Sequence, residues 1–542
     1  MKLKKTVLLL SSLLTACTAT QTYDKVLVSE GNPQHLIQIG GEWVREGNAL
    51  TASGGKTYLV TEELVSDALF EMEAELRIDG LQSANASFIL WGNNLNFDGK
   101  DKNSPEPVMT FSGDLVGKPV VIGKTADFIQ PAQPFVLKVK SEPQAIVFYI
   151  DGKKIFDCPA QAGKKDRIGF RAGTAGMAIY SFRMNGETEK QAPLAYLYKN
   201  GEGGYDTFRI PALVVSNQGT VLAFAEGRKN SASDTGNIDI VLKRSNDNGK
   251  TWSPLQVVWD DAENTCGNPM PLVDKETGTI FLLSTHNLGT DYERDIVAET
   301  SQDTRRVFVL QSTDDGQTWS AAKEITKSVK KDNWTWYATG PCQGIQLTHG
   351  KHKGRLVVPA DHIEAKTKKY FSHVIYSDDH GKTWKLGGRT PSDQVNECTV
   401  AELEGGNILL NMRNYDRRMH TRKVSVSDDG GESWGELRAD PMLIEPICQG
   451  SLHRYSFCEE GKGRLLFLNP ACVDARKNMT LRISYDDGQT WSHSQVLYPG
   501  PAAYSDLTRL PDGRIGCFYE AGYAYPYEGI VFETVNLSEI EN

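Results

Sequence analysis

The stretch that decides the fold is Ser312-Thr313-Asp314-Asp315-Gly316-Gln317-Thr318-Trp319, because its pattern returns along the second part of the chain. Ser-x-Asp-x-Gly-x-Thr-Trp occurs in full at 245–252, 312–319, 377–384 and 484–491, and a fifth copy at 427–434 has Ser433 in place of threonine. The first residues of successive copies lie 50 to 67 positions apart. A period of this size predicts a propeller or a solenoid.

The residues around each repeat favour the propeller. Every copy follows an apolar strand such as 306–310, and Asp followed by Gly suits a tight hairpin in which Asp bonds its own backbone. The closing Trp can then pack between neighbouring sheets. Five copies and the sequence ahead of the first predict six four-stranded blades over residues 191–542, with the two ends of the segment sharing one blade to close the ring.

Residues 17–190 have a different texture, with short apolar runs between turn residues. Residues 69–76 alternate apolar and acidic positions, and the run 145–150 leads directly into Asp151-Gly152, which is a hairpin signal. This pattern predicts a lectin-like β-sandwich, so the whole chain is expected to be all-β. Trp43 and Trp91 are either core residues or sugar-stacking platforms, which makes this domain a candidate for carbohydrate binding.

The N-terminus has the pattern of a signal peptide over residues 1–16. Lysines at 2, 4 and 5 precede the apolar run 6–14, and Leu14-Thr15-Ala16-Cys17 resembles the lipobox of bacterial lipoproteins. The expected protein is therefore exported, as a periplasmic or outer-membrane lipoprotein, at the cell surface or secreted. An ordinary secretory signal with an incidental cysteine is the alternative. No later stretch reaches the roughly 18 apolar residues of a membrane span, so a lipid anchor is the expected membrane contact.

Charge and cysteine content exclude other classes. The net charge of −10 argues against a nucleic-acid binder held by its overall field. The eight cysteines after Cys17 are widely spread, without Cys-x-x-Cys or zinc-finger spacing, and buried free thiols are their expected state. No His-x-x-x-His pair surrounds a Glu, so neither a metal nor another cofactor is expected.

The repeat resembles the Asp-box of bacterial sialidases, and three further motifs make the resemblance specific. They are Phe208-Arg209-Ile210-Pro211, Ala225-Glu226-Gly227-Arg228 and Ala338-Thr339-Gly340-Pro341. The resemblance covers roughly residues 193–542. It implies an exo-alpha-sialidase with a six-bladed propeller, a retaining glycoside hydrolase that acts as a monomer on sialylated glycans of glycoproteins, glycolipids and oligosaccharides.

Sialic acid carries a carboxylate on its anomeric carbon, and planar guanidinium groups bind such a group with bidentate geometry. The resemblance places the arginine triad of the family at Arg209, Arg413 and Arg476. Arg482 is an alternative for the third position, because it lies one strand's length from Arg476. Arg228 is expected at the border of the same carboxylate site.

A neutral tyrosine suits this substrate as nucleophile, because a carboxylate would be repelled by the substrate's own charge; sialidases are the tyrosine exception among glycosidases. By resemblance Tyr504 is the nucleophile, Glu397 the base that takes its proton, and Asp234 the acid/base. Glu520 is expected to orient the first arginine. Asp239 lies close to Asp234 but belongs to an alternating strand, where a structural role is expected.

Two alternatives share these motifs. A sialyl-transferring or anhydro-forming enzyme has the same catalytic set and differs in its product. A non-catalytic sialoglycan-binding propeller is the alternative from another class, although it does not need Tyr504, Glu397 and Asp234 together. Linkage preference does not follow from the residues.

Overall fold

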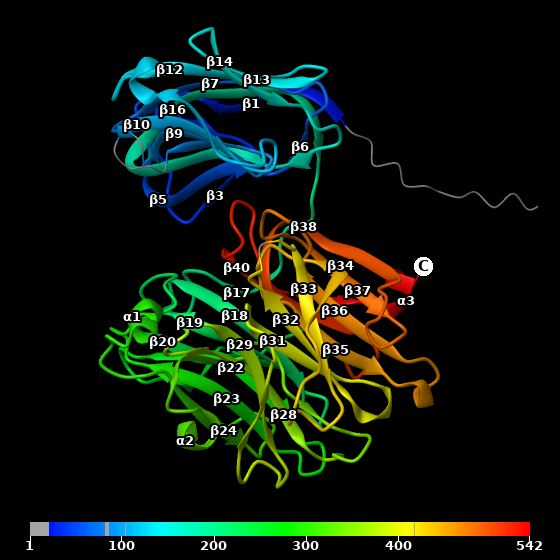
Figure 1. Cartoon of the computed structure of the whole chain (residues 1–542). Helices are drawn as coiled ribbons and strands as arrows, with labels where there is room; N and C mark the ends of the chain where they lie inside the picture. Colours follow the sequence, from blue (N-terminus) through cyan, green and yellow to red (C-terminus); the bar gives the residue numbers. More distant parts are fainter. Residues whose placement is uncertain (1–20, 82–85, 103, 417, 542) are drawn as a thin grey trace, which may run out of the picture. The chain divides into compact units, whose positions relative to one another are not determined.

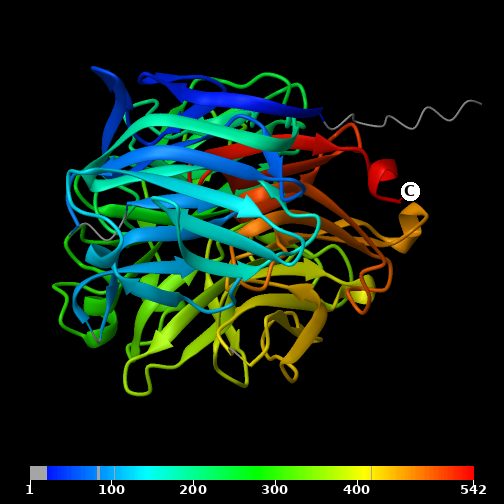
Figure 2. The same cartoon turned by 90° about the horizontal axis from the view of Figure 1, so that it is seen from above.

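The computed structural model of the chain describes residues 21–81, 86–102, 104–416 and 418–541. These residues form two compact units, which divide between Ala192 and Pro193 (Figures 1 and 2). The predicted signal peptide and Cys17 lie outside the described residues. Within the described ranges, no helix has the length and apolar character needed to cross a membrane.

The first unit is built of β-strands in two layers (Figure 1). Its strands are β1 (Gln21–Ser29), β2 (Asn32–Pro33), β3 (Leu36–Ile39), β4 (Val44–Glu46), β5 (Ala49–Thr61), β6 (Leu64–Ser66), β7 (Glu71–Ile78), β8 (Ser87–Leu90), β9 (Asn93–Asp101), β10 (Ser104–Ser112), β11 (Val120–Lys124), β12 (Pro134–Ser141), β13 (Ala145–Ile150), β14 (Lys153–Pro159), β15 (Lys165–Asp166) and β16 (Ile168–Glu189). The long strand β16 joins the layers, because it pairs with β8 and β7 and also with β5 and β1.

The local predictions for this unit are confirmed. In β7 the odd positions from Glu71 face outward and the apolar positions are buried. The hairpin between β13 and β14 turns at Asp151 and Gly152, whose φ angles of 48° and 77° are both positive, as a two-residue hairpin with the right twist requires.

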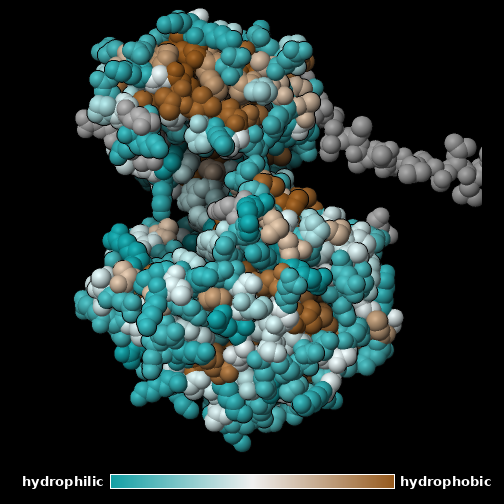
Figure 3. Space-filling model, in the orientation of Figure 1, coloured by the Kyte–Doolittle hydropathy of each residue, from teal (hydrophilic) through white to brown (hydrophobic). Residues whose placement is uncertain are grey.

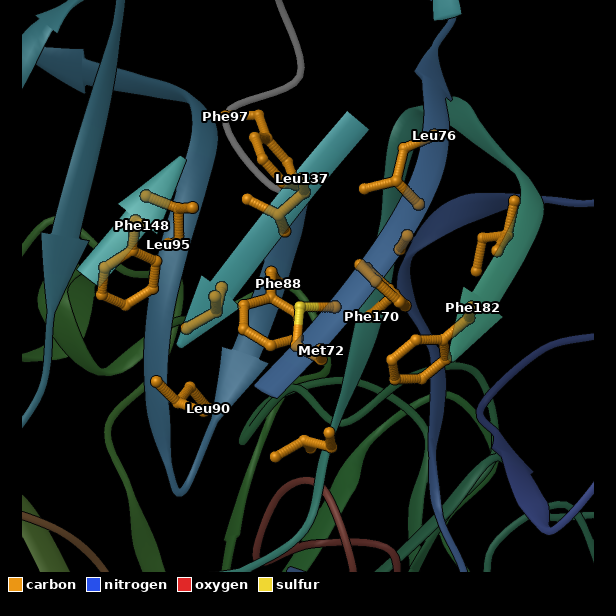
Figure 4. Close-up of a cluster of buried hydrophobic side chains, with 14 of the residues drawn as sticks. Met72, Leu76, Phe88, Leu90, Leu95, Phe97, Leu137, Phe148, Phe170 and Phe182 are labelled. Atoms are coloured by element: carbon orange, nitrogen blue, oxygen red, sulfur yellow. The ribbon is translucent and has the colours of Figure 1, made fainter. Parts of the chain in front are cut away.

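Aromatic side chains fill the core between the layers, including Phe88, Phe148 and Phe170 (Figure 4). Trp43 and Trp91 belong to the same core, with 4% and 0% of their surface exposed. The hypothesis that they are sugar-stacking platforms is therefore wrong, because neither ring is open to a ligand. Carbohydrate binding by this unit stays a prediction. One face of the unit carries a patch of apolar residues within a hydrophilic surface (Figure 3).

The second unit is a six-bladed propeller, which confirms the predicted fold class. The strands of its first three blades are β18 (Thr207–Val215), β19 (Val221–Arg228), β20 (Ile238–Ser245) and β21 (Gln256–Trp259); β22 (Thr265–Val273), β23 (Ile280–Asn287), β24 (Arg306–Ser312) and β25 (Lys323–Glu324); and β26 (Trp334–Thr339), β27 (Ile345–Gln346), β28 (Leu356–Glu364), β29 (Tyr370–Ser377) and β30 (Lys385–Arg389).

The remaining three blades include both ends of the segment. Their strands are β31 (Val395–Glu402), β32 (Ile408–Asn414), β33 (Thr421–Ser427) and β34 (Arg438–Ile444); β35 (Ser451–Ser456), β36 (Arg464–Pro470), β37 (Lys477–Ser484) and the first half of β38 (His493–Arg509); and the second half of β38 with β39 (Ile515–Ala521), β40 (Gly529–Val535) and β17 (Tyr196–Lys199). Strand β17 pairs antiparallel with β40, so the ring closes as predicted. The helices are α1 (Glu293–Ala298), α2 (Thr326–Val329) and α3 (Leu537–Glu541).

Each Asp-box is the turn between the third and fourth strands of a blade. In the second blade, Asp314 Oδ1 accepts hydrogen bonds from Ser312 Oγ (2.8 Å) and the Thr318 amide (2.9 Å), and the Gly316 amide donates to Ser312 Oγ. The other four copies repeat these bonds, and Ser433 donates its hydroxyl as threonine does elsewhere. The closing Trp of a copy packs on the preceding blade, as Trp319 does on Phe224.

Candidate active site

The inner strands of the blades are irregular where they reach one end of the central axis. Pairing registers shift between Arg209 and Ala212 in β18, between Val395 and Cys398 in β31, and between Ala502 and Ser505 in β38. A β-bulge re-aims the side chains next to it. These bulges bracket the motifs that carry Arg209, Glu397 and Tyr504, and they turn these residues toward a common pocket.

That pocket has a volume of about 210 Å³. It is lined by Arg209, Ile210, Glu226, Arg228, Asp234, Asn268, Glu293, Arg305, Trp336, Ala338, Asp361, Asn396, Glu397, Arg413, Tyr415, Arg476 and Tyr504. Seven of the eight residues expected from the sequence lie in this wall, although they come from four different blades. The eighth, Glu520, lies behind Arg209.

Tyr504 and Glu397 meet at the floor of the pocket. The phenolic hydroxyl donates to Glu397 Oε1 at 2.5 Å. Arg413 donates from one nitrogen to both residues, at 2.6 Å to Glu397 Oε2 and 2.9 Å to the Tyr504 oxygen. Burial and the charge of Glu397 raise the pKa of Tyr504 well above its usual value. The tyrosine is therefore a neutral phenol whose proton already points at a base, with a cation beside its oxygen.

Glu520 holds both the first arginine and the strand of the tyrosine. It is fully buried and accepts Arg209 in bidentate fashion, at 3.0 Å from Nε and 3.1 Å from a terminal nitrogen. It also accepts the backbone amides of Ile210 (2.9 Å) and Tyr504 (3.1 Å). Four donors thus converge on one carboxylate, and the third nitrogen of Arg209 remains directed toward the pocket.

The structure separates the two candidates for the third arginine. Arg476 lies in the loop between β36 and β37, lines the pocket and donates to the Tyr527 hydroxyl and to the Ile447 carbonyl. Arg482 lies in β37 and donates to Asn469 inside the blade. Only the first of them is placed to meet a ligand in this pocket.

Asp234 lies in the loop between β19 and β20, at the open side of the pocket, with 73% of its side chain exposed. Arg228 contacts its carboxylate at 2.7 Å and Arg209 at 3.5 Å. Enclosure by the pocket walls opposes ionisation, but these two arginines outweigh it and lower the pKa of Asp234. Asp239 accepts the Tyr205 hydroxyl at 2.6 Å and pairs with Lys229, so its expected structural role fits its position.

Several pocket residues were missed at the sequence level, and Asp361 is the most unusual. Only 1% of it is exposed, and neither of its carboxylate oxygens has a hydrogen-bond partner among the described residues. Burial, with Glu397 and Glu293 nearby, raises the pKa of Asp361 well above its usual value. Its surroundings therefore favour the neutral form of the carboxyl, and in that form it can donate a hydrogen bond. In the sequence, Asp361 could have been noticed as an acidic residue within the largely apolar run 356–363.

A second missed group is Arg305 with Trp336. The buried guanidinium of Arg305 lies over the Trp336 ring at 4.1 Å. It donates to the side chains of Asn287 and Asn268, and it forms no ion pair within 4.0 Å in the described part of the chain. Burial lowers its pKa to about 10, so it remains a cation at neutral pH. No sequence motif marks either residue.

The fold and the pocket define a class: a six-bladed Asp-box propeller with an arginine cluster around a tyrosine and a carboxylate. Residues 219–517 match the family described as "BNR repeat-like domain". The chain is 37% identical over 340 residues to a sialidase of Micromonospora viridifaciens, covering 60% of this chain and 52% of that protein. It is 32% identical over 372 residues to an exo-alpha-sialidase of Aspergillus fumigatus, covering 62% and 86%.

Among solved structures, the Hadza microbial sialidase Hz136 superimposes with a TM-score of 0.58 at 25% identity, over 93% of this chain and 99% of that one. The chain therefore belongs to the BNR-repeat sialidase family. It spans 52% and 64% of the length of its bacterial relatives from Micromonospora viridifaciens and Bacteroides fragilis.

Proposed function

We propose that this chain is an exo-alpha-sialidase that hydrolyses terminal sialic acids from glycoconjugates with retention, through a tyrosyl-enzyme intermediate. The observation that carries the proposal is the contact of the Tyr504 hydroxyl with Glu397 at 2.5 Å beside three arginines. The arginines Arg209, Arg413 and Arg476 suit the substrate carboxylate, and that carboxylate places the anomeric carbon over the tyrosine oxygen.

In the first step, the Tyr504 oxygen bonds to the anomeric carbon while its proton passes to Glu397. The bond from that carbon to the leaving oxygen breaks, and Asp234 supplies the proton that this oxygen takes. In the second step, water loses a proton to Asp234 and bonds to the anomeric carbon. The tyrosine oxygen leaves and recovers its proton from Glu397. Two displacements at one carbon give net retention.

The lowered pKa of Asp234 has a consequence for this mechanism, because a general acid must hold a proton. In the free protein, Arg209 and Arg228 favour the carboxylate. A substrate carboxylate that binds Arg209 competes for that cation and adds a negative charge nearby. Substrate binding therefore raises the pKa of Asp234, and the acid acquires its proton in the complex.

Product analysis tests the proposal. Purified protein is incubated with α2-3, α2-6 and α2-8 sialosides, and the released sugar and its initial anomer are identified by NMR. Free α-sialic acid is expected. An anhydro sugar or a transferred sialyl group would assign the alternative activities, and binding without turnover would assign a lectin. Tyr504→Phe is expected to lose most turnover while it keeps the thermal unfolding profile; a near-normal rate would refute the nucleophile.

We also propose that the chain is exported and anchored through a lipid on Cys17. The support is the basic, apolar and small-residue pattern of residues 1–17. Expression with a labelled fatty acid tests this: the wild-type chain should carry the label and sediment with membranes, whereas Cys17→Ala should do neither. Label on the variant would refute the anchor.

A further inference from the structure

The strand that carries Tyr504 has one edge beside which no other strand runs. From Ala502 to Arg509, β38 pairs with β39, whereas its pairing with β37 ends at Pro501. The second edge of this stretch is the innermost edge of its blade. Backbone amides and carbonyls that are buried there need other partners, because a buried polar group without a hydrogen bond is costly.

Gln449 takes the place of a strand at this edge. Its Oε1 accepts the amide of Ser505 at 2.9 Å, and its Nε2 donates to the carbonyl of the same residue at 2.9 Å. The second hydrogen of Nε2 is donated to the carbonyl of Pro341 at 3.1 Å. One side chain therefore bonds both backbone groups of the residue next to Tyr504 and links them to the third blade.

The loop that carries Gln449 is itself held by buried contacts. Residues 445–450 connect β34 to β35. Arg422 and Glu445 form an ion pair at 2.8 Å, with 0% and 1% of their side chains exposed, and Arg422 also donates to the carbonyl of Cys448 at 2.7 Å. Gln449 is 1% exposed. A buried polar network in which each member has a partner is rigid, so the amide of Gln449 has a fixed position.

Hydrogen bonds from two sides thus fix the backbone around Tyr504. Glu520 in β39 accepts the Tyr504 amide at 3.1 Å, and Gln449 bonds Ser505 from the opposite edge. The pairing register with β39 shifts between Ala502 and Ser505, so regular strand pairing does not fix this stretch. The phenolic oxygen lies at the far end of the side chain, where a small rotation of the backbone is amplified, and a catalytic group must stay within about 0.5 Å of its productive position.

We propose that Gln449 is a positioning residue for the catalytic tyrosine: by fixing the backbone of Ser505, it keeps the Tyr504 oxygen on Glu397 and directed into the pocket. The inference rests on the proposed role of Tyr504 as nucleophile. Gln449 lies outside the pocket wall, so it acts through the tyrosine and not on the substrate. The inference also gives a role to the motif at 338–341, because the Pro341 carbonyl holds the same side chain.

The first variant is Gln449→Met, which keeps the length of the side chain and removes its three hydrogen bonds. For a fluorogenic sialoside, kcat/KM should fall about a hundredfold, because a displacement of about 1 Å costs this much in rate. The affinity for an unsaturated sialic acid analogue, which has no leaving group, should stay nearly unchanged. The arginines expected to bind its carboxylate are held by Glu520 and Glu397 and not by Gln449.

Gln346 offers a matched control, because it is a buried glutamine with the same number of hydrogen bonds. Its Nε2 donates to Asp274 at 3.0 Å and to the Gly354 carbonyl at 3.2 Å, and its Oε1 accepts the Lys275 amide at 2.7 Å. It lies in β27, outside the pocket wall. Gln346→Met should lower the midpoint of thermal unfolding about as much as Gln449→Met does, while kcat/KM stays that of the parent chain.

Hydrogen exchange followed by mass spectrometry tests the backbone contact without a substrate. The Ser505 amide loses its acceptor in Gln449→Met, so the peptide 503–507 should exchange faster than in the parent chain and in Gln346→Met. If the methionine variant does not fold, Gln449→Ala replaces it, because the smaller side chain leaves room for water at the strand. A parent chain that binds the analogue but releases no sialic acid would refute the proposed function, whereas the exchange result would still decide on the backbone contact.

Three results would overturn the inference. The first is an equal decrease of kcat/KM in Gln449→Met and Gln346→Met, which would assign Gln449 a role in stability alone. The second is a loss of affinity for the analogue as large as the loss in kcat/KM, which would mean that the whole pocket is damaged. The third is unchanged exchange of the peptide 503–507.

Discussion

Replacement of Glu520 by glutamine tests how the pocket is held together. The carboxylate accepts four hydrogen bonds, two on each oxygen. A glutamine side chain has only one acceptor oxygen. In either orientation, its NH2 group therefore faces two of the four donors and cannot accept from them. Two bonds are lost, and the buried Arg209 loses its bidentate partner. Breaking a buried ion pair costs about 3 to 5 kcal/mol, so the free energy of unfolding should fall by that amount.

Activity should fall as well, because Glu520 aligns Arg209 and also bonds the amide of Tyr504. A loss of about 2.7 kcal/mol in transition-state stabilisation corresponds to a hundredfold decrease in kcat/KM. Urea unfolding followed by tryptophan fluorescence gives the stability, and a fluorogenic sialoside gives kcat/KM. Part of the loss should appear in KM, since Arg209 is expected to bind the substrate carboxylate.

Glu533 provides the matched control. It lies in the neighbouring strand β40 and its carboxylate accepts the Tyr519 hydroxyl at 2.7 Å, and no arginine in the described part of the chain forms an ion pair with it within 4.0 Å. Glu533→Gln keeps an acceptor for that bond, and its effect should stay within about 1.5 kcal/mol. If Glu520→Gln unfolds within about 1 kcal/mol of the wild type, or matches Glu533→Gln, the reasoning about convergent donors is wrong.

Three further predictions concern the acid, the repeats and a buried lysine. Asp234→Asn should slow sialosides with poor leaving groups at least tenfold more than activated ones; equal losses in kcat/KM would count against the acid role. Hydrogen bonds from Thr318 lower the pKa of Asp314 to about 2, so the free energy of unfolding should decrease as pH falls from about 4 to 2. In acid unfolding experiments, Asp314→Asn should make this decrease smaller, and an unchanged curve would contradict the prediction. Burial lowers the pKa of Lys330 to about 7, so the free energy of unfolding should rise with pH between about 7 and 10. In urea titrations at several pH values, Lys330→Met should remove this dependence on pH, and an identical dependence would refute the lowered pKa of Lys330.

The repeats specify the propeller because they are local. Asp314, Ser312, Gly316 and Thr318 bond within one turn, so the pattern itself contains the contacts that form it. The same holds for Asp151-Gly152, where two positive φ angles are needed within a two-residue hairpin. Such features require no knowledge of distant parts of the chain.

The role of a tryptophan in this chain can be predicted from the sequence only where it belongs to a repeat. Five of the ten close the Asp-boxes, and their position in the repeat indicates their role. Trp43 and Trp91 have no such context, and the core of the first unit had to be known before a sugar-stacking role was excluded. Trp336 faces Arg305 in the pocket because a loop of the second blade meets an inner strand of the third, and spacing along the chain does not encode that meeting.

The chain's residue pattern alone was therefore sufficient for an all-β architecture, six blades, ring closure and a list of candidate residues, since each depends on local periodicity or on a short motif. Tertiary structure decided which arginine completes the pocket and that Glu520 accepts four hydrogen bonds. It also decided that the Asp361 carboxyl lies near Glu397 without a hydrogen-bond partner among the described residues. These properties arise from the convergence of separate blades on one axis. Burial and charge act through distance in space, and that distance exists only once the ring has closed.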